Sequence, residues 1–330
     1  MKTKTWAWLG AAWLTAMTLA GCGGAASTAS GDQVKTIRID YAYYNPVSLV
    51  LKEKKWLEEE LAKDGIAVEW VLSAGSNKAL ELLNSNSIDF GSTAGAAALL
   101  GRANGNPIKA VYVYSKPEWT ALVTSADSGI NDVQDLRGKK IAVTRGTDPH
   151  IFLLRALDEA GLDENDVELV QLQHADGKAA LEKGDVDAWA GLDPYMAQTE
   201  LERGSRLFFR NPEWNTYGFL NVREAFAERH PELVEKVLAV YEKGRRWALE
   251  HPAEFLALVA AQSQQTEQVA SRVLERTDLS NPVIGETHRQ AIRAASHVLL
   301  KSGVIDQDTD TEAVIEDLID PRFTQGWSAD

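Results

Sequence analysis

Cysteine is almost missing from this chain, because Cys22 is the only one among 330 residues. An intramolecular disulfide is therefore impossible, and a cysteine-rich zinc site is excluded. The six histidines include no HxxxH pair, so we expect no metal and no cofactor. The motifs GxxxxGK[ST] and GxSxG are also absent, and no nucleophile stands beside a base. The sequence therefore predicts a binding protein rather than an enzyme.

Positive charge is also scarce. The chain has 34 Lys and Arg residues against 48 Asp and Glu residues, a net charge of −14. The net charge falls to near −16 if the first residues, which include Lys2 and Lys4, are removed. A chain this acidic is repelled by phosphate backbones and by anionic membrane surfaces, so we expect no nucleic-acid partner.

An apolar run from Trp6 to Leu19 opens the chain and leads into Leu-Ala-Gly-Cys at 19–22. The run is shorter than the about 20 residues of a membrane-spanning helix, so residues 1–21 are predicted to be a cleaved export signal. The small residues before Cys22 resemble a lipobox, which predicts a lipid on that cysteine. The Gly/Ala/Ser-rich residues 22–33 would then be a flexible tether. We expect an extracytoplasmic protein anchored to the cell membrane.

From Ile37 onward, short β-branched or aromatic runs alternate with helical patterns, which is typical of an α/β fold. A helix is predicted from Pro46 to Gly65, since Asn45 can cap it and Gly65 can end it. The stretch 88–99 predicts the end of a buried strand and then a helix, with small hydrogen-bonding residues between them.

The same order of elements returns later in the chain. NKALELLNSNSIDFG (77–91) resembles GKAALEKGDVDAWAG (177–191), and we match Asp89 with Asp187. Common ancestry and chance similarity explain this equally well, and both predict two similar α/β lobes. Two stretches with Pro-Glu-Trp, 114–127 and 209–224, are predicted to cross between the lobes, and the helical tail from Pro231 to return to the first. We therefore assign 34–118 and 217–330 to lobe 1 and 119–216 to lobe 2, with a ligand cleft between the lobes.

Four strand-to-helix junctions would face this cleft. They are Tyr43–Asn45, Gly75–Asn77, Gly91–Thr93 and Arg145–Asp148. Helix N-termini carry unpaired N–H groups that bind anions, although each junction alone is better explained as an ordinary helix cap. Their matching places in two lobes favour a ligand site. Aromatic residues are expected to line the cleft at Tyr43, Tyr44, Tyr114, Trp189 and Tyr217. Core packing is the alternative for every aromatic residue, and it is favoured most for Trp70 and Trp119.

Three segments carry a resemblance to a known family: SIDFGSTAGAAAL, LRGKKIAVTRGTDPHIFLLRALDEAGL and EKGDVDAWAGLDPY. They resemble the solute-binding lipoproteins of ABC importers for aliphatic sulfonates, a family related to the taurine and nitrate binders, and the match covers nearly all of 34–325. The resemblance implies a type II periplasmic-binding-protein fold, a small anionic ligand and a permease partner. We expect a monomer.

The resemblance also implies which residues hold the ligand. It places Ser92, Thr93, Gly146 and Thr147 at the anionic head group, with Ser76 and Asn77 close by and Trp189 and Asp193 facing them. Asp148 departs from the small neutral residue that sulfonate binders often have, so it either caps its own helix or contacts a cationic ligand. The predicted ligand-binding set is Tyr44, Asn45, Ser76, Asn77, Ser92, Thr93, Tyr114, Gly146, Thr147, Asp148, Trp189, Asp193 and Tyr217.

Other functions remain open at this point. Taurine, nitrate or a thiamine-precursor ligand would fit the same transport role. An enzyme on the same fold would need a reactive lysine, histidine or cysteine in the cleft. A ligand-sensing regulator would need a DNA-binding helical module and a basic patch, and the sequence has neither.

Overall fold

The computed structural model describes residues 33–327. Residues 1–32, which include Cys22, the predicted signal and nearly all of the predicted tether, lie outside the described residues. From Lys35 onward the described chain forms one compact unit. Within 33–327, no helix is long and apolar enough to cross a membrane.

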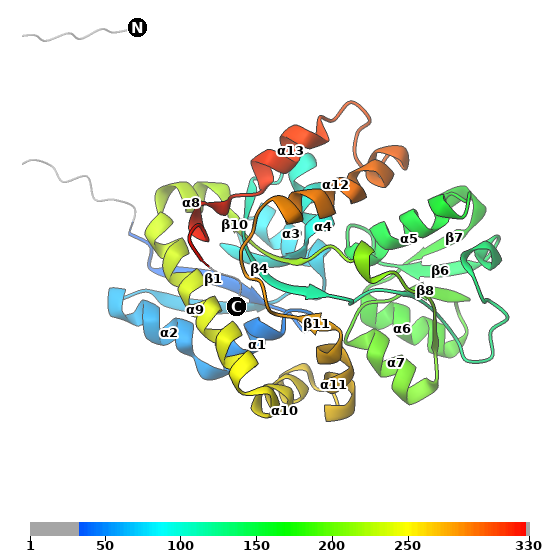
Figure 1. Ribbon diagram of the computed structural model, residues 1–330, viewed down its shortest axis with the longest axis horizontal. Coiled ribbons are helices and arrows are strands. Elements are labelled where there is room, and N and C mark those ends of the chain that lie inside the picture. The colour runs from blue at the N-terminus through cyan, green and yellow to red at the C-terminus, as the bar shows by residue number, and fades with distance from the viewer. Residues whose placement is uncertain (1–32, 328–330) are drawn as a thin grey trace, which may run out of the picture. The chain divides into compact units, whose positions relative to one another are not determined.

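A six-stranded sheet belongs to the part that we call the first lobe, with strand order β11-β4-β10-β3-β1-β2 (Figure 1). β1 runs parallel to β2 and β3, whereas β10 runs antiparallel to β3 and β4. The strands are β1 (Thr36–Tyr41), β2 (Ala67–Leu72), β3 (Phe90–Ala94), β4 (Ile108–Pro117), β10 (Gly218–Arg223) and β11 (Thr277–Asp278).

A five-stranded sheet belongs to the second lobe, with order β7-β6-β8-β5-β9. β6 runs parallel to β7 and β8, and β5 runs antiparallel to β8 and β9. The strands are β5 (Leu122–Thr124), β6 (Lys140–Val143), β7 (Glu168–Gln171), β8 (Ala188–Ala190) and β9 (Arg206–Phe209). The predicted α/β class is confirmed, while the exact lobe boundaries stay a prediction.

Helices follow the parallel strands of both sheets. Those before β4 and after β10 are α1 (Pro46–Lys54), α2 (Trp56–Leu61), α3 (Ser76–Asn84), α4 (Gly95–Ala103), α8 (Glu224–Arg229), α9 (Pro231–Glu250), α10 (Pro252–Ser263), α11 (Glu267–Glu275), α12 (Glu286–Lys301) and α13 (Thr311–Leu318). Those between β5 and β10 are α5 (Asp148–Glu159), α6 (His174–Lys183) and α7 (Tyr195–Arg203). The tail returns to the first lobe, because α9 packs on α1 and α12 packs on α4.

The two aligned aspartates make the same contacts in the two sheets. Asp89 Oδ2 accepts a hydrogen bond from the backbone N–H of Arg38 at 2.8 Å, and Asp187 Oδ2 accepts one from Lys140 at 2.8 Å. Each aspartate also donates its own N–H to the carbonyl of the same partner. Asp89 and Asp187 therefore occupy equivalent positions in the two sheets, at a spacing of 187 − 89 = 98 residues. An end-to-end alignment of 77–91 with 177–191 has a spacing of 100 residues, so it pairs these aspartates only with a gap of two residues.

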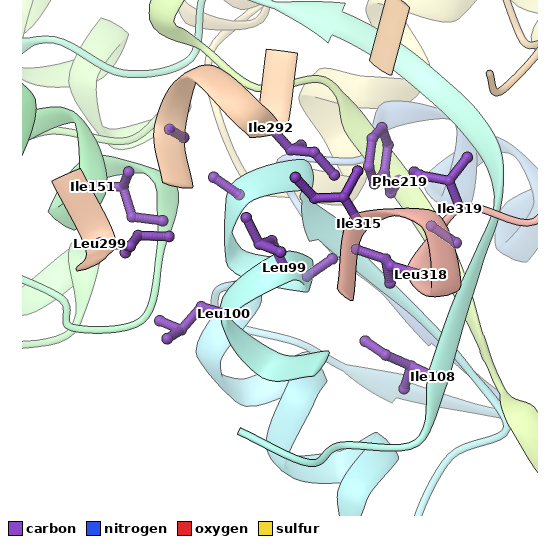
Figure 2. Packing of buried hydrophobic residues seen from close by; sticks show 14 of the residues in the cluster. Leu99, Leu100, Ile108, Ile151, Phe219, Ile292, Leu299, Ile315, Leu318 and Ile319 are labelled. Carbon is purple, nitrogen blue, oxygen red and sulfur yellow. The ribbon is translucent and has the colours of Figure 1, made fainter. Parts of the chain in front are cut away.

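One large apolar cluster continues from the first lobe onto α5. Leu99 and Leu100 of α4 and Leu299 of α12 belong to this cluster together with Ile151 and Leu154 of α5. Figure 2 shows Ile151 beside Leu299. The two lobes therefore share buried apolar contacts along α5.

Two local predictions were wrong. The helix predicted from Pro46 is interrupted at Lys55, whose left-handed φ of 56° separates α1 from α2. Gly91 to Thr93 lie within β3 rather than at a helix start, since small side chains let β3 pair between β1 and β10.

Candidate functional site

A buried aspartate gathers three of the predicted ligand residues inside the first lobe. Ser92 donates its N–H and its hydroxyl to the two carboxylate oxygens of Asp40, each at 2.8 Å. Asn45 Nδ2 donates to Ser92 Oγ at 2.8 Å, and the Tyr44 hydroxyl donates to the Ser92 carbonyl at 2.9 Å. Burial raises the pKa of Asp40 to about 6. The hydroxyl proton of Ser92 is therefore already used within the protein.

Asn45 also caps α1, as its sequence position suggests. Its Oδ1 accepts the backbone N–H of Ser48 at 3.2 Å, and Pro46 follows in the first turn. Tyr44 is buried, and its ring meets Trp119 edge to face at 5.9 Å between centroids. These two residues thus stabilise the end of β1 and the start of α1.

Ser76, Thr93 and Tyr114 lie around the end of β3. Ser76 Oγ accepts the N–H of Ala94 at 3.0 Å, and the Tyr114 hydroxyl donates to the Thr93 carbonyl at 3.4 Å. Thr93 Oγ1 accepts a hydrogen bond from Asn221 Nδ2 at 2.8 Å. The alternative that Thr93 caps the next helix is wrong, since Ala94 occupies the N-cap of α4.

Asp148 joins the first turn of α5 to both crossing segments. Its Oδ2 accepts hydrogen bonds from Trp119 Nε1 at 2.8 Å and from the N–H of Thr216 at 3.0 Å, and its Oδ1 accepts from Thr216 Oγ1 at 2.6 Å. Thr216 Oγ1 accepts in turn the N–H of Ala96 in α4. The expected helix cap at Asp148 is therefore wrong: Thr147 is the N-cap residue, and the carboxylate binds the crossing segments.

Burial raises the pKa of Asp148 to about 6, although its three donors favour the ionised form. The Thr147 hydroxyl donates to the Thr144 carbonyl at 2.6 Å, so it does not cap α5. Tyr217, the residue after Thr216, packs against His288 at 4.4 Å between ring centroids. Tyr217 is half-buried within the second crossing segment.

Asp193 lies at the start of α7 and faces the helical tail. Its Oδ1 accepts the N–H of Ala197 at 2.9 Å, and its Oδ2 lies 3.6 Å from Arg276 Nη1. Burial raises the pKa of Asp193 to about 7, against the effect of Arg276. The structure thus places Asp193 in an ion pair between α7 and the end of α11.

Trp189 is fully buried and belongs to the apolar cluster of the second lobe with Val123, Leu181 and Met196. Core packing, the alternative to a ligand wall, is what the structure shows for its ring. Its Nε1 nevertheless has no hydrogen-bond partner. A Cβ on Gly177 would lie 2.6 Å from that nitrogen, so Nε1 approaches the first turn of α6 closely.

The two lobes meet closely at Gly75. A Cβ placed on Gly75 would lie 2.8 Å from Asn77 Oδ1 and 2.9 Å from His174 Nε2, so both atoms lie close to one point. A Cβ on Gly146 would lie 3.8 Å from Cβ of Asn77. Asn77 therefore lies between the loop after β6 and the start of α6. Asn77 Oδ1 and His174 Nε2 are both buried, and neither has a hydrogen-bond partner among residues 33–327.

Three helices begin around Asn77. They are α3, α5 and α6. Among the described residues, no side chain of an N-cap residue accepts a hydrogen bond from the first N–H groups of these helices. The first N–H groups of a helix have no intrahelical partner, and the helix dipole makes this end positive. The arrangement of Asn77, Gly146 and His174 therefore suits a small anion.

Two tyrosines, one from each lobe, lie within electrostatic range of each other. Tyr43 follows β1 in the first lobe, and Tyr195 opens α7 in the second. Burial first, and then the proximity of Tyr43, raise the pKa of Tyr195. Both side chains are only half-buried, so they offer apolar surface with a polar end.

Sequence reasoning missed His174, Trp119 and Tyr195. The internal repeat held a signal for the first of them, because the spacing that pairs Asp89 with Asp187 also places His174 opposite Ser76, the first residue of α3. Nothing in the local sequence pairs Trp119 with Asp148. Within the described part of the chain, no group of three His, Cys, Asp or Glu residues is arranged to hold a metal ion.

Comparisons with known proteins show the family of this chain. Residues 49–255 match the model of the family described as NMT1/THI5 like. The chain is 33% identical over 303 residues to the "Putative aliphatic sulfonates-binding protein" of Bacillus subtilis (strain 168), which covers 90% of this chain and 91% of that relative.

Solved structures show the same fold. The alkanesulfonate-binding protein SsuA of Xanthomonas axonopodis pv. citri, bound to MOPS, superposes with a TM-score of 0.78 at 23% identity over 86% of this chain and 98% of its own. The periplasmic aliphatic sulphonate binding protein SsuA of Escherichia coli gives a TM-score of 0.74 at 26% identity over 88% and 93%. The predicted periplasmic-binding-protein fold is confirmed.

Proposed function

Since this chain belongs to the NMT1/THI5-like family, we propose that it is the extracytoplasmic solute-binding component of an ABC importer and that it binds an aliphatic sulfonate. It would deliver this solute to the permease of the cell membrane without changing it chemically. The relatives named above support the substrate class, and the site geometry supports a small organic anion.

One observation carries the proposal: the starts of α3, α5 and α6 meet at Asn77, and within residues 33–327 no side chain caps their first backbone N–H groups. An anion only accepts hydrogen bonds, so it can bind these N–H groups and the amide nitrogen of Asn77. The buried Nε2 of His174, which has no hydrogen-bond partner among the described residues, lies at the same point. The sulfonate head would lie at this point. Its alkyl chain would extend between Tyr43 and Tyr195.

The helix dipoles alone do not explain tight binding. Each terminus contributes about 0.3 to 1 kcal/mol, up to about 2 when partly buried, whereas micromolar affinity requires about 8 kcal/mol. Hydrogen bonds at Asn77 and His174 and apolar contact with the tyrosines must supply the remainder. The affinity is therefore predicted to depend on both the head group and the alkyl chain of the ligand.

A calorimetric panel on the full chain, purified in a mild detergent, tests the function. We expect an alkanesulfonate to bind with micromolar or tighter affinity and to be recovered unchanged. Asn77→Ala should weaken binding by about tenfold or more, the value of a lost hydrogen bond to a charged group. Asn104→Ala, the same change at an exposed position of the first lobe, is the matched control.

Each failure has a distinct meaning. Tighter binding of nitrate, taurine or a thiamine precursor than of any alkanesulfonate would move the assignment to that ligand. Conversion of the ligand during incubation would support an enzyme, with His174 as its reactive side chain.

We also propose that lipid on Cys22 anchors the protein, on the basis of the Leu-Ala-Gly-Cys run and the tether-like sequence after it. Cys22→Ser should release the protein or leave an unprocessed precursor. Incorporation of labelled fatty acid into the Cys22→Ser protein would contradict the anchor.

A further inference from the structure

The hydrogen bonds around His174 determine which ring nitrogen carries a proton. The Thr144 hydroxyl donates its single hydrogen to the Leu172 carbonyl at 2.7 Å. The same oxygen lies 3.2 Å from His174 Nδ1, so in this contact Nδ1 must be the donor. The neutral ring therefore carries its proton on Nδ1. Nε2 then has only a lone pair, which is directed toward Gly75 and Asn77.

A bare lone pair is the wrong partner for an anion. His174 is only 1% exposed, and its Nε2 has no hydrogen-bond partner within the part of the chain that the structure describes. It lies at the first residue of α6, where the unpaired N–H groups favour negative charge. An anionic head group at this point would meet donors from the helices and a lone pair from the ring. Protonation of Nε2 removes this conflict, because the imidazolium ring donates from both nitrogens.

We propose that His174 is a ligand-binding residue that takes up one proton when the anionic solute binds. The proton comes from solvent and is held on Nε2, from which it is donated as a hydrogen bond to an oxygen of the head group. No bond of the solute forms or breaks. This inference rests on the proposed function, since it requires an anion at the site.

The pKa of His174 in the protein alone supports this assignment. Burial lowers the pKa of His174 to about 3, so the ring is neutral at physiological pH without a ligand. Burial is the only cause of this shift, although titratable groups stand on every neighbouring element: Asp176 and Lys178 on α6, Arg145 after β6, Lys78 on α3, Tyr43 after β1 and Tyr195 on α7. A ligand anion beside the ring would raise its pKa again.

Proton uptake has a fixed consequence for affinity. The pKa of His174 is higher in the complex than in the free protein, so protons are taken up at every pH between the two values. Within that interval affinity falls as pH rises, by up to about tenfold per pH unit. An alkanesulfonate does not itself titrate near neutral pH, so the ligand adds no slope.

Calorimetry with butanesulfonate at about pH 5.5 and about pH 8, in buffers of different ionisation enthalpy, tests the inference on the full chain. We expect the wild type to bind at least about tenfold more weakly at the higher pH and to take up protons on binding. H174Q keeps a neutral donor and should bind with little pH dependence. H297Q, at an exposed histidine of α12, is the matched control and should behave like the wild type.

The outcomes separate the inference from the proposed function. Sulfonate binding by the wild type without proton uptake would overturn the role of His174 and leave the function standing. The same holds if H174Q keeps the full pH dependence. If the wild type binds no alkanesulfonate at either pH, both the function and this inference are wrong. The measurement of proton uptake uses the wild type alone, so it does not depend on the folding of a variant.

Discussion

The indole N–H of Trp119 donates to Oδ2 of Asp148 at 2.8 Å and so ties the first crossing segment to the start of α5. Thr216, from the second crossing segment, donates twice to the same carboxylate. Both segments that connect the lobes therefore meet at one buried side chain. Asp148 serves the connection between the lobes, and its three protein donors leave no need for a cationic ligand.

Asp148→Asn tests this role through its dependence on pH. Near pH 5 the wild-type carboxyl is largely protonated, because burial raises its pKa to about 6. An amide group offers one acceptor oxygen to three donors, so we expect the variant to lose about 1 to 3 kcal/mol of unfolding free energy there. Urea unfolding followed by fluorescence measures this loss.

The sign of the pH effect follows from linkage. The folded wild type binds this proton more tightly than the unfolded chain, so its stability falls as pH rises from about 4 through about 6. The variant has no carboxyl at this position and does not lose this stability. The difference in unfolding free energy between wild type and variant should therefore narrow by about 1 kcal/mol from pH 5 to pH 8. Asp308→Asn, at an exposed position, is the control and should change the unfolding free energy neither at pH 5 nor at pH 8. A hundredfold loss of ligand affinity with unchanged stability would instead place Asp148 against a cationic ligand.

Thr93→Val tests whether the Thr93 hydroxyl stabilises the fold through Asn221 or binds the anionic ligand. The substitution keeps the shape of the side chain but removes the acceptor of Asn221 Nδ2. We expect a loss of about 1 kcal/mol of unfolding free energy and a smaller effect on affinity than that of Asn77→Ala. Calorimetry and urea unfolding of the same protein give both numbers. A large loss of affinity at constant stability would show that the anion lies on Thr93, as the sequence alone predicts.

Gly75→Ala tests the close approach of the lobes. The added methyl would lie 2.8 Å from Asn77 Oδ1 and 2.9 Å from His174 Nε2, within the space proposed for the head group. We expect affinity for an alkanesulfonate to fall by about tenfold or more, since overpacking of this kind costs about 1 to 3 kcal/mol. Gly129→Ala meets no atom within 4 Å and is the control. Unchanged affinity in Gly75→Ala would place the ligand elsewhere.

Affinity should rise with the length of the alkyl chain. Each methylene buried between Tyr43 and Tyr195 contributes about 0.8 kcal/mol, or about fourfold in affinity. Calorimetry with methane-, ethane- and butanesulfonate measures this series. Tyr43→Ala should flatten it while leaving methanesulfonate binding nearly unchanged. A flat series in the wild type would argue against an apolar wall.

The sequence was sufficient for the fold because its signals are local and occur twice. The pairing of Asp89 with Asp187 follows from the resemblance between 77–91 and 177–191, and the two carboxylates make equivalent hydrogen bonds. The cap at Asn45 and the end of the helical segment at Gly65 also follow from local backbone chemistry. The break at Lys55 carries no such signal, since lysine rarely adopts a left-handed conformation.

The site was harder to predict because its residues come together only through tertiary contacts. Ser92 has the composition of an anion site, yet its hydrogen bonds go to Asp40, a partner 52 residues away. Trp189 follows the pattern of a strand end, but β8 places its ring in the core. His174 gains its importance from Gly75, which belongs to the other lobe. Neither composition nor periodicity records a contact of this kind.

A crystal structure of the complex with butanesulfonate tests the central claim most directly. The account predicts the sulfonate oxygens within hydrogen-bonding distance of Asn77 and of His174 Nε2, at the starts of α3, α5 and α6, with the alkyl chain against Tyr43 and Tyr195. A sulfonate bound to Ser92 and Asp40, or outside the space between the two lobes, would contradict it.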